Sequence, residues 1–204
     1  MQDVERAIAE IAGIRSRLAE SSQFRGYSPE SLGVIGMIAV VLGVVLAVRP
    51  AIAPTLAAQV LAWGTLMLAA SVSLTVEALV RARGRHGALA LDMARAVLKG
   101  MLPFTVTGAA TAIALVAYAP AALWLAPALW LMLVGLVCFS WKPMMPDAIV
   151  WAGVWYLGAG IALLVMGGRT GQTPPLAMAA AIGIGHLFIA CLLHHAERDA
   201  RTPT

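Results

Sequence analysis

Residues 100–141 read GMLPFTVTGAATAIALVAYAPAALWLAPALWLMLVGLVCFSW, and no side chain between Lys99 and Lys142 is charged. One continuous helix of that length would be about 60 Å long at 1.5 Å per residue. This is twice the ~30 Å thickness of the hydrocarbon core of a bilayer. The stretch must therefore fold back, and Pro120 marks the turn. We expect two membrane-spanning helices, over residues 102–118 and 121–140.

The whole chain has the composition of a membrane protein. Of its 204 residues 61% are hydrophobic and 12% are charged, and its mean hydropathy is +0.86; soluble domains carry about 25% charge. A spanning helix needs about 20 mostly apolar residues. Six runs meet this need, at about 31–48, 55–80, 102–118, 121–140, 148–166 and 175–194. We predict an all-α, polytopic bundle of six transmembrane helices forming one domain over 30–195, between a cytoplasmic segment 1–29 and a cytoplasmic tail 196–204.

Orientation follows from the basic residues. With the N-terminus inside, only Arg49 and Arg169 among the 14 lysines and arginines lie outside. This bias agrees with the positive-inside rule and requires an even number of spans. Both termini are therefore predicted to be cytoplasmic. A cleavable signal peptide is not expected, since about thirty residues with several charges precede the first apolar run.

Two cytoplasmic segments are predicted to be helical without crossing the membrane. Residues 3–21 place Val4, Ile8, Ile11 and Leu18 on one side of an amphipathic helix. Residues 81–100 form a basic turn followed by an apolar stripe, which predicts an interfacial helix between the second and third spans. Within the spans, small residues recur at four- and seven-residue spacing and predict close helix packing. They include Ala39 and Gly43, with Gly36, in the first span, and Ala181 and Gly185 in the last.

The segment from Ile14 to Ser28, with Ile14-Arg15-Ser16 followed by Glu20, Ser22 and Phe24, resembles the opening of a family of uncharacterised bacterial membrane proteins. The resemblance continues in the arginine-rich turn after the second span, in residues 129–136 leading to Lys142, and at Gly185-His186. It implies a six-span protein of the bacterial inner membrane and no specific activity. The segment 143–146 departs from the family's pattern. The first hairpin also resembles the glycine-rich hairpins of acid-resistance membrane proteins.

Glu77 is the one acidic residue within a predicted span and stands four residues before Arg81. This spacing predicts a local ion pair. The functional alternative is a coupling carboxylate of a proton-driven carrier, to which Gln59 on the same helix adds a polar contact.

His186 is the histidine that lies well inside a span, and we expect it to form an interhelical hydrogen bond beside a closely packed glycine. A ligand or proton site is the alternative. His194 lies about 12 Å further along the helix, too far to share a metal with it. Cys138 and Cys191 form no CxxC pair and no ligand cluster. No catalytic residue, metal or cofactor is predicted.

The first functional hypothesis is a non-enzymatic sensor or interaction partner that acts through a basic cytoplasmic face. The residues predicted to dock the partner are Arg15, Arg17, Arg25, Arg83, Arg85, Arg95 and Lys99. The expected partners are membrane lipid with anionic headgroups and a cytoplasmic protein; direct nucleic-acid binding is not expected, and homo-oligomerisation is left open. The second hypothesis is a small transporter or a carrier of hydrophobic ligands, and an enzyme ranks third because no catalytic signature is present.

Overall fold

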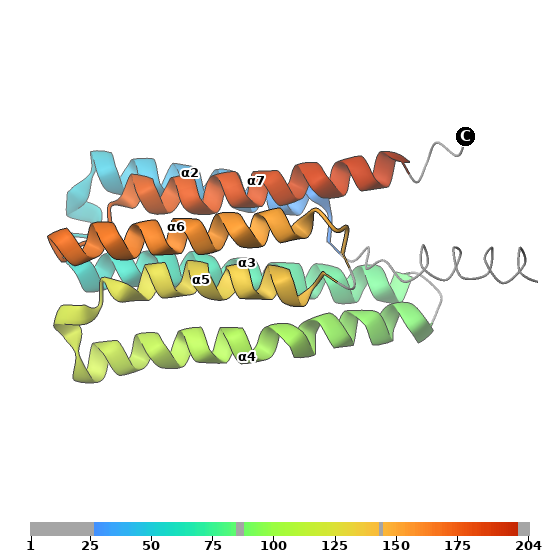
Figure 1. The fold of residues 1–204 in the computed structure, drawn as a ribbon, viewed down its shortest axis with the longest axis horizontal. Helices are drawn as coiled ribbons and strands as arrows, with labels where there is room; N and C mark the ends of the chain where they lie inside the picture. The colour runs from blue at the N-terminus through green and yellow to red at the C-terminus, as the bar shows by residue number, and fades with distance from the viewer. Residues whose placement is uncertain (1–26, 85–87, 143–144, 200–204) are drawn as a thin grey trace, which may run out of the picture.

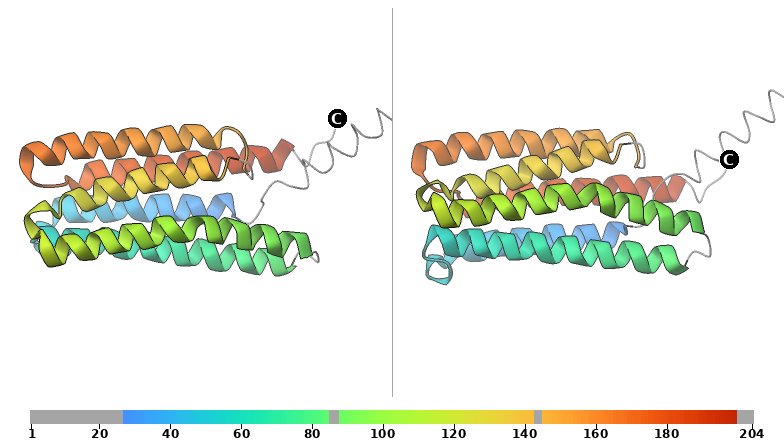
Figure 2. Two further views of the ribbon diagram at one scale, coloured as in Figure 1. Left: turned by 60° about the horizontal axis from the view of Figure 1, so that its bottom comes forward. Right: turned by 90° about the horizontal axis from the view of Figure 1, so that it is seen from below.

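The computed structural model describes residues 27–84, 88–142 and 145–199. Its long elements in these ranges are the α-helices α2 (Pro29–Val48), α3 (Leu56–Gly84), α4 (Ala88–Tyr118), α5 (Leu125–Ser140), α6 (Ile149–Thr170) and α7 (Pro175–Asp199). Two short 3-10 helices, η1 (Pro50–Ile52) and η2 (Pro120–Ala122), lie in the turns before α3 and α5. The six α-helices run side by side along the long axis of the molecule (Figure 1, Figure 2).

Five of these helices are long and apolar enough to cross a membrane, whereas α5 is a shorter apolar helix. The prediction of an all-α, multi-pass membrane protein is confirmed at this level. With 16 residues, α5 is about 24 Å long. The predicted fourth span began at residue 121, but residues 121–124 belong to η2 and the turn before α5 and are not α-helical.

Local sequence explains where the helices begin and end. Ser28 caps α2, because its Oγ accepts a hydrogen bond from the Ser31 amide at 3.1 Å, and Pro29 supplies the fixed φ of a first helical residue. The same helix ends at Val48, and Pro50 follows after Arg49. The C-terminus of α6 is capped by Gly171, whose φ of 67° is a left-handed conformation that favours glycine.

Residues 88–100 do not form the separate interfacial helix that the sequence predicts. They are the first turns of α4, which continues without interruption through Pro103 to Tyr118. Gly100 costs a helix only about 1 kcal/mol relative to alanine, so nothing before Pro103 ends it. Arg81 and Arg83 therefore lie on an extension of α3, and Arg95 and Lys99 lie on an extension of α4. Similarly, α7 continues past the predicted span end at His194 to Asp199.

Successive helices from α2 to α7 are neighbours, and α7 returns to pack against α2, which closes the ring. Contact is most extensive between α2 and α7 and between α5 and α6. Within the most apolar 18 residues of each helix, half of the residues of α7 are buried, but only 6% of those of α4 are. The last helix is thus the most enclosed part of the bundle and α4 the most peripheral.

Glycines bring the two closest helix pairs together. A Cβ added at Gly43 of α2 would overlap Ala179 of α7 and lie 2.9 Å from the Pro175 carbonyl oxygen. Between α5 and α6, a Cβ on Gly135 would lie 2.9 Å from the Gly153 carbonyl oxygen. The small-residue spacing predicted close packing at Gly43, and α2 and α7 do approach closely there. Small residues commonly allow such close approach between membrane helices.

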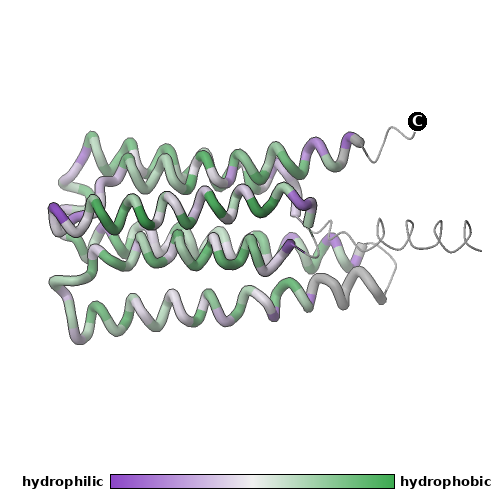
Figure 3. The backbone as a smooth tube through the Cα atoms, viewed as in Figure 1, coloured by the Kyte–Doolittle hydropathy of each residue, from purple (hydrophilic) through white to green (hydrophobic). Residues whose placement is uncertain are grey.

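Polar residues gather at the two ends of the bundle, and apolar residues cover its length (Figure 3). We call the end of the bundle where α2, α4 and α6 begin and α3, α5 and α7 end the Tyr27 end (Figure 1), because Tyr27 directly precedes the Ser28 cap of α2. The opposite end, with the α2–α3, α4–α5 and α6–α7 turns, is the Arg49 end. Large apolar side chains such as Leu61 and Ile113 are about 70% and 69% exposed along the sides. This surface fits a hydrocarbon environment.

Candidate functional site

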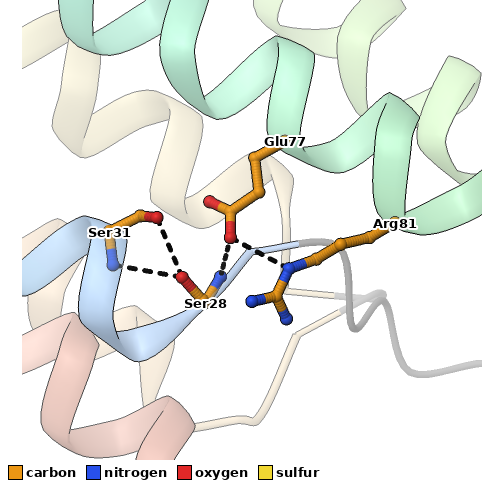
Figure 4. Close-up of polar contacts among 4 residues, drawn as sticks. All are labelled: Ser28, Ser31, Glu77 and Arg81. Atoms are coloured by element: carbon orange, nitrogen blue, oxygen red, sulfur yellow. Dashed lines mark hydrogen bonds and ion pairs between the residues drawn. The ribbon is translucent and has the colours of Figure 1, made fainter.

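Glu77 joins α3 to the start of α2 at the Tyr27 end (Figure 4). Its Oε1 accepts a hydrogen bond from the Ser28 backbone amide at 3.2 Å and lies 2.9 Å from Nε of Arg81. The predicted ion pair between Glu77 and Arg81 is thus present. The Arg81 side chain is 36% exposed and that of Glu77 is 17% exposed, so the pair is partly screened by solvent.

The position of Glu77 gives its carboxylate a second role. The first N–H groups of a helix lack intrahelical partners and carry a partial positive charge. Glu77 places its carboxylate at this positive end of α2, next to the Ser28 cap (Figure 4). Because α2 and α3 otherwise make few contacts, this bond is a principal polar link between the two helices.

Aromatic residues enclose the same region. The rings of Tyr27 and Trp141 lie 5.5 Å apart, and the Tyr27 hydroxyl lies 3.4 Å from the sulfur of Met101 on α4. Burial and the nearby carboxylate of Glu77 raise the pKa of Tyr27 well above its ordinary value, so its phenol stays neutral. Among the described residues, Glu77 Oε2 and Trp141 Nε1 are buried without a hydrogen-bond partner. The cluster combines a carboxylate, a neutral phenol and an indole.

A second polar contact lies inside the bundle. The Tyr156 hydroxyl of α6 is 2.6 Å from Nδ1 of His186 on α7, and this nitrogen is also 3.1 Å from the Ile182 carbonyl oxygen. Either imidazole tautomer therefore leaves Nδ1 with a partner. Both side chains are buried. The predicted interhelical hydrogen bond of His186 is present, and its partner is Tyr156.

Neighbouring residues fit this contact closely. A Cβ at Gly185 would overlap the Tyr156 ring, and one at Gly36 of α2 would lie 3.2 Å from Cβ of His186. Trp155 adds another α6–α7 bond, since its Nε1 donates to the Ala181 carbonyl oxygen at 2.9 Å. The arrangement fits a packed helix junction.

Gln59 is not part of either cluster. Its side-chain amide donates to the Ala53 carbonyl oxygen at 3.4 Å, in the turn between α2 and α3. Eighteen positions along α3 separate it from Glu77, or about 27 Å of helix. The structure therefore separates two residues that the sequence combined in one carrier hypothesis.

Basic residues lie near the end of α3 and near the start of α4. Arg81 and Arg83 are in the last turn of α3, and Arg95 and Lys99 are exposed on the opening turns of α4. Three further residues predicted to dock a partner, Arg15, Arg17 and Arg25, lie outside the described residues together with the predicted N-terminal amphipathic helix, and so does Arg85. We call Arg83, Arg95 and Lys99 the basic patch.

Sequence reasoning missed three partners in these clusters: Ser28, Tyr156 and Trp141. A serine directly before a proline is a strong helix-start signal, so the cap at Ser28 could have been found. The contact of Tyr156 with His186 joins residues 30 positions apart, and no local pattern marks it. Among the described residues, no group of three histidine, cysteine or acidic side chains is placed to hold a metal ion.

No family model, curated protein or solved structure matches this chain. The resemblance to the bacterial membrane-protein family stays a prediction.

Proposed function

We propose that this chain is a non-enzymatic, six-span protein of the bacterial inner membrane with both termini in the cytoplasm. It acts as a sensor or interaction partner through the basic patch at its Tyr27 end. Its fold as a multi-pass membrane protein supports the proposal through five long apolar helices. The remaining span, fourth in chain order, is α5, because α4 and α6 both run from the Tyr27 end to the Arg49 end, and α5 returns the chain between them (Figure 1).

The distribution of basic residues carries the proposal. In the described ranges the Arg49 end has Arg49 and Arg169, whereas the Tyr27 end has the larger set. That set is Arg81, Arg83, Arg95, Lys99, Lys142 and Arg198. The positive-inside rule assigns the more basic end to the cytoplasm.

Helix length explains why this end is accessible. With 29 and 31 residues, α3 and α4 are about 43 and 46 Å long. The hydrocarbon core is about 30 Å thick, so both helices extend into the headgroup region and beyond. The basic patch lies on these extensions. Anionic lipid attracts each such residue by about 1 kcal/mol, and a cytoplasmic protein with an acidic surface would be held in the same way.

A matched pair of variants tests the proposal in native membranes. One replaces the basic patch (Arg83→Gln, Arg95→Gln, Lys99→Gln), and the control replaces the two residues at the opposite end (Arg49→Gln, Arg169→Gln). After cross-linking of the full chain, the patch variant should lose a stoichiometric cytoplasmic partner that the wild type and the control retain. Equal retention by both variants would contradict action through the patch, provided that all three proteins insert equally.

A second candidate function, a proton-coupled carrier, is favoured by one observation. Glu77 Oε2 is buried and has no hydrogen-bond partner among the described residues. A carboxylate oxygen without a partner is available to take up and release a proton. Proton flux into proteoliposomes that is abolished by Glu77→Gln and retained in Glu77→Asp would support this candidate over the first.

A further inference from the structure

A shallow groove follows the outer side of α2 where it meets α7. Gly33 leaves space there, since a Cβ at this position would have no neighbour within 4 Å. Val34, Met37 and Val41 line the groove from α2, and Leu187 lines it from α7. Its volume is about 550 Å³, and the groove is open to the surroundings along the side of the bundle. The lining surface is apolar along the whole length of the groove.

The dimensions of the groove match one leaflet of a bilayer. From Glu30 to Val41, eleven residue steps along α2 correspond to about 16 Å. Half of a ~30 Å hydrocarbon core is about 15 Å. All 20 residues of α2 make a helix about 30 Å long, so Pro29 and Glu30 lie at one interface when α2 spans the core. The groove therefore extends from the headgroup level to about the middle of the membrane.

The mouth of the groove carries a negative charge. Glu30 is exposed in the first turn of α2, and its apolar atoms border the groove at the Tyr27 end, so its carboxylate stands beside the groove. A carboxylate at headgroup level attracts an ammonium group and repels the phosphate of an anionic lipid. Stabilisation of the α2 dipole explains an acidic residue in the first turn but does not explain the apolar groove that continues from it.

We propose that this groove binds one acyl chain of an aminophospholipid from the leaflet at the Tyr27 end, with Glu30 paired to the headgroup ammonium. The apolar lining holds the chain, and the carboxylate selects an amine headgroup over an uncharged or anionic one. The groove is lined by α2 and α7, whereas the basic patch lies on α3 and α4, so the two sites attract lipids of different headgroup chemistry.

Native mass spectrometry of the full chain, released from nanodiscs with equal phosphatidylethanolamine and phosphatidylglycerol, tests the headgroup assignment. The wild type should retain phosphatidylethanolamine in about two- to fivefold preference, as expected for an exposed ion pair. Glu30→Gln should remove the preference, and Glu30→Asp should retain it. Asp147→Asn is the matched control, since Asp147 is exposed in the α5–α6 turn at the same end, and it should leave the preference unchanged.

A second pair of variants tests the acyl-chain site. Gly33→Leu fills the groove, whereas Gly158→Leu adds the same side chain on α6 at another open position, where a Cβ also meets nothing within 4 Å. Retained lipid of both headgroups should fall in Gly33→Leu and stay at the wild-type level in Gly158→Leu. An unchanged preference in Glu30→Gln, or unchanged retention in Gly33→Leu, would overturn the proposal. A wild-type dimer that Gly33→Leu dissociates would overturn the proposal, because a second copy of the chain would then occupy the groove. Higher lipid retention after deletion of residues 2–21 would also overturn it, because the N-terminal segment would then be the occupant.

Discussion

Replacing Gly43 by alanine should separate the two helices that pack most closely. The added methyl group would overlap Cβ of Ala179 and lie 2.9 Å from the Pro175 carbonyl oxygen. Neither atom is the end of a flexible side chain. For the two methyl groups to reach a contact distance of about 3.5–4.0 Å, α2 and α7 must move apart by on the order of 1 Å. Overpacking of this kind costs about 1–3 kcal/mol.

Gly33→Ala is the matched control on the same helix, because its Cβ would meet nothing within 4 Å. Both variants gain the preference of a helix for alanine over glycine, about 1 kcal/mol. The difference between them therefore isolates the steric cost. It can be measured by unfolding in detergent with increasing dodecyl sulfate, followed by circular dichroism.

We expect Gly43→Ala to be less stable than Gly33→Ala by about 1–3 kcal/mol. The double variant Gly43→Ala with Ala179→Gly should recover part of the loss, since it moves the methyl group from α7 to α2 and leaves the Pro175 contact. Equal stability of the two single variants would refute the close packing of α2 against α7.

Three further predictions concern the polar clusters and the N-terminus. Glu77→Gln should lower the free energy of unfolding by about 0.5–1 kcal/mol, since the ion pair with Arg81 is partly exposed and glutamine still accepts the Ser28 amide; a larger loss in chemical unfolding would contradict this. Tyr156→Phe should cost about 0.6 kcal/mol, typical of a hydrogen bond between membrane helices, and His186→Leu should cost more because it also disturbs packing; no loss in either variant would exclude a stabilising bond. Deletion of residues 2–21 should leave insertion and folding intact, as judged by monodisperse elution in detergent, and remove a cytoplasmic interaction; aggregation of the truncated protein would instead make the segment structural.

The positions of the apolar helices could be predicted because length and charge alone determine them. Residues 100–141 had to fold back at Pro120, and the structure has a turn there, with η2 at Pro120–Ala122. The predicted loop between the second and third spans was less accurate, since the charges of Arg81 and Lys99 suggested that the spanning helices end there. Helices can continue beyond the hydrocarbon core, and α3 and α4 do so: α3 continues to Gly84, and α4 begins at Ala88 and continues through Pro103.

The partners of the polar residues could be predicted only where they are local. The bond between Glu77 and Arg81 follows from a spacing of four residues on one helix. Ser28 and Glu77 are 49 positions apart, and their contact depends on how α2 packs beside α3. Lipid is as apolar as leucine, so hydrophobic periodicity does not show which faces of membrane helices meet. For the same reason the sequence identified His186 as a polar residue in a span but not Tyr156 as its partner.

The membrane topology of the C-terminus tests the six-span proposal most directly. Paired reporters, one active in the periplasm and one in the cytoplasm, can be fused after Thr204 of the full chain, with fusions after Arg169 as the internal reference. We predict a cytoplasmic signal after Thr204 and a periplasmic signal after Arg169. A periplasmic signal after Thr204 would contradict an even number of spans and the cytoplasmic assignment of the basic patch.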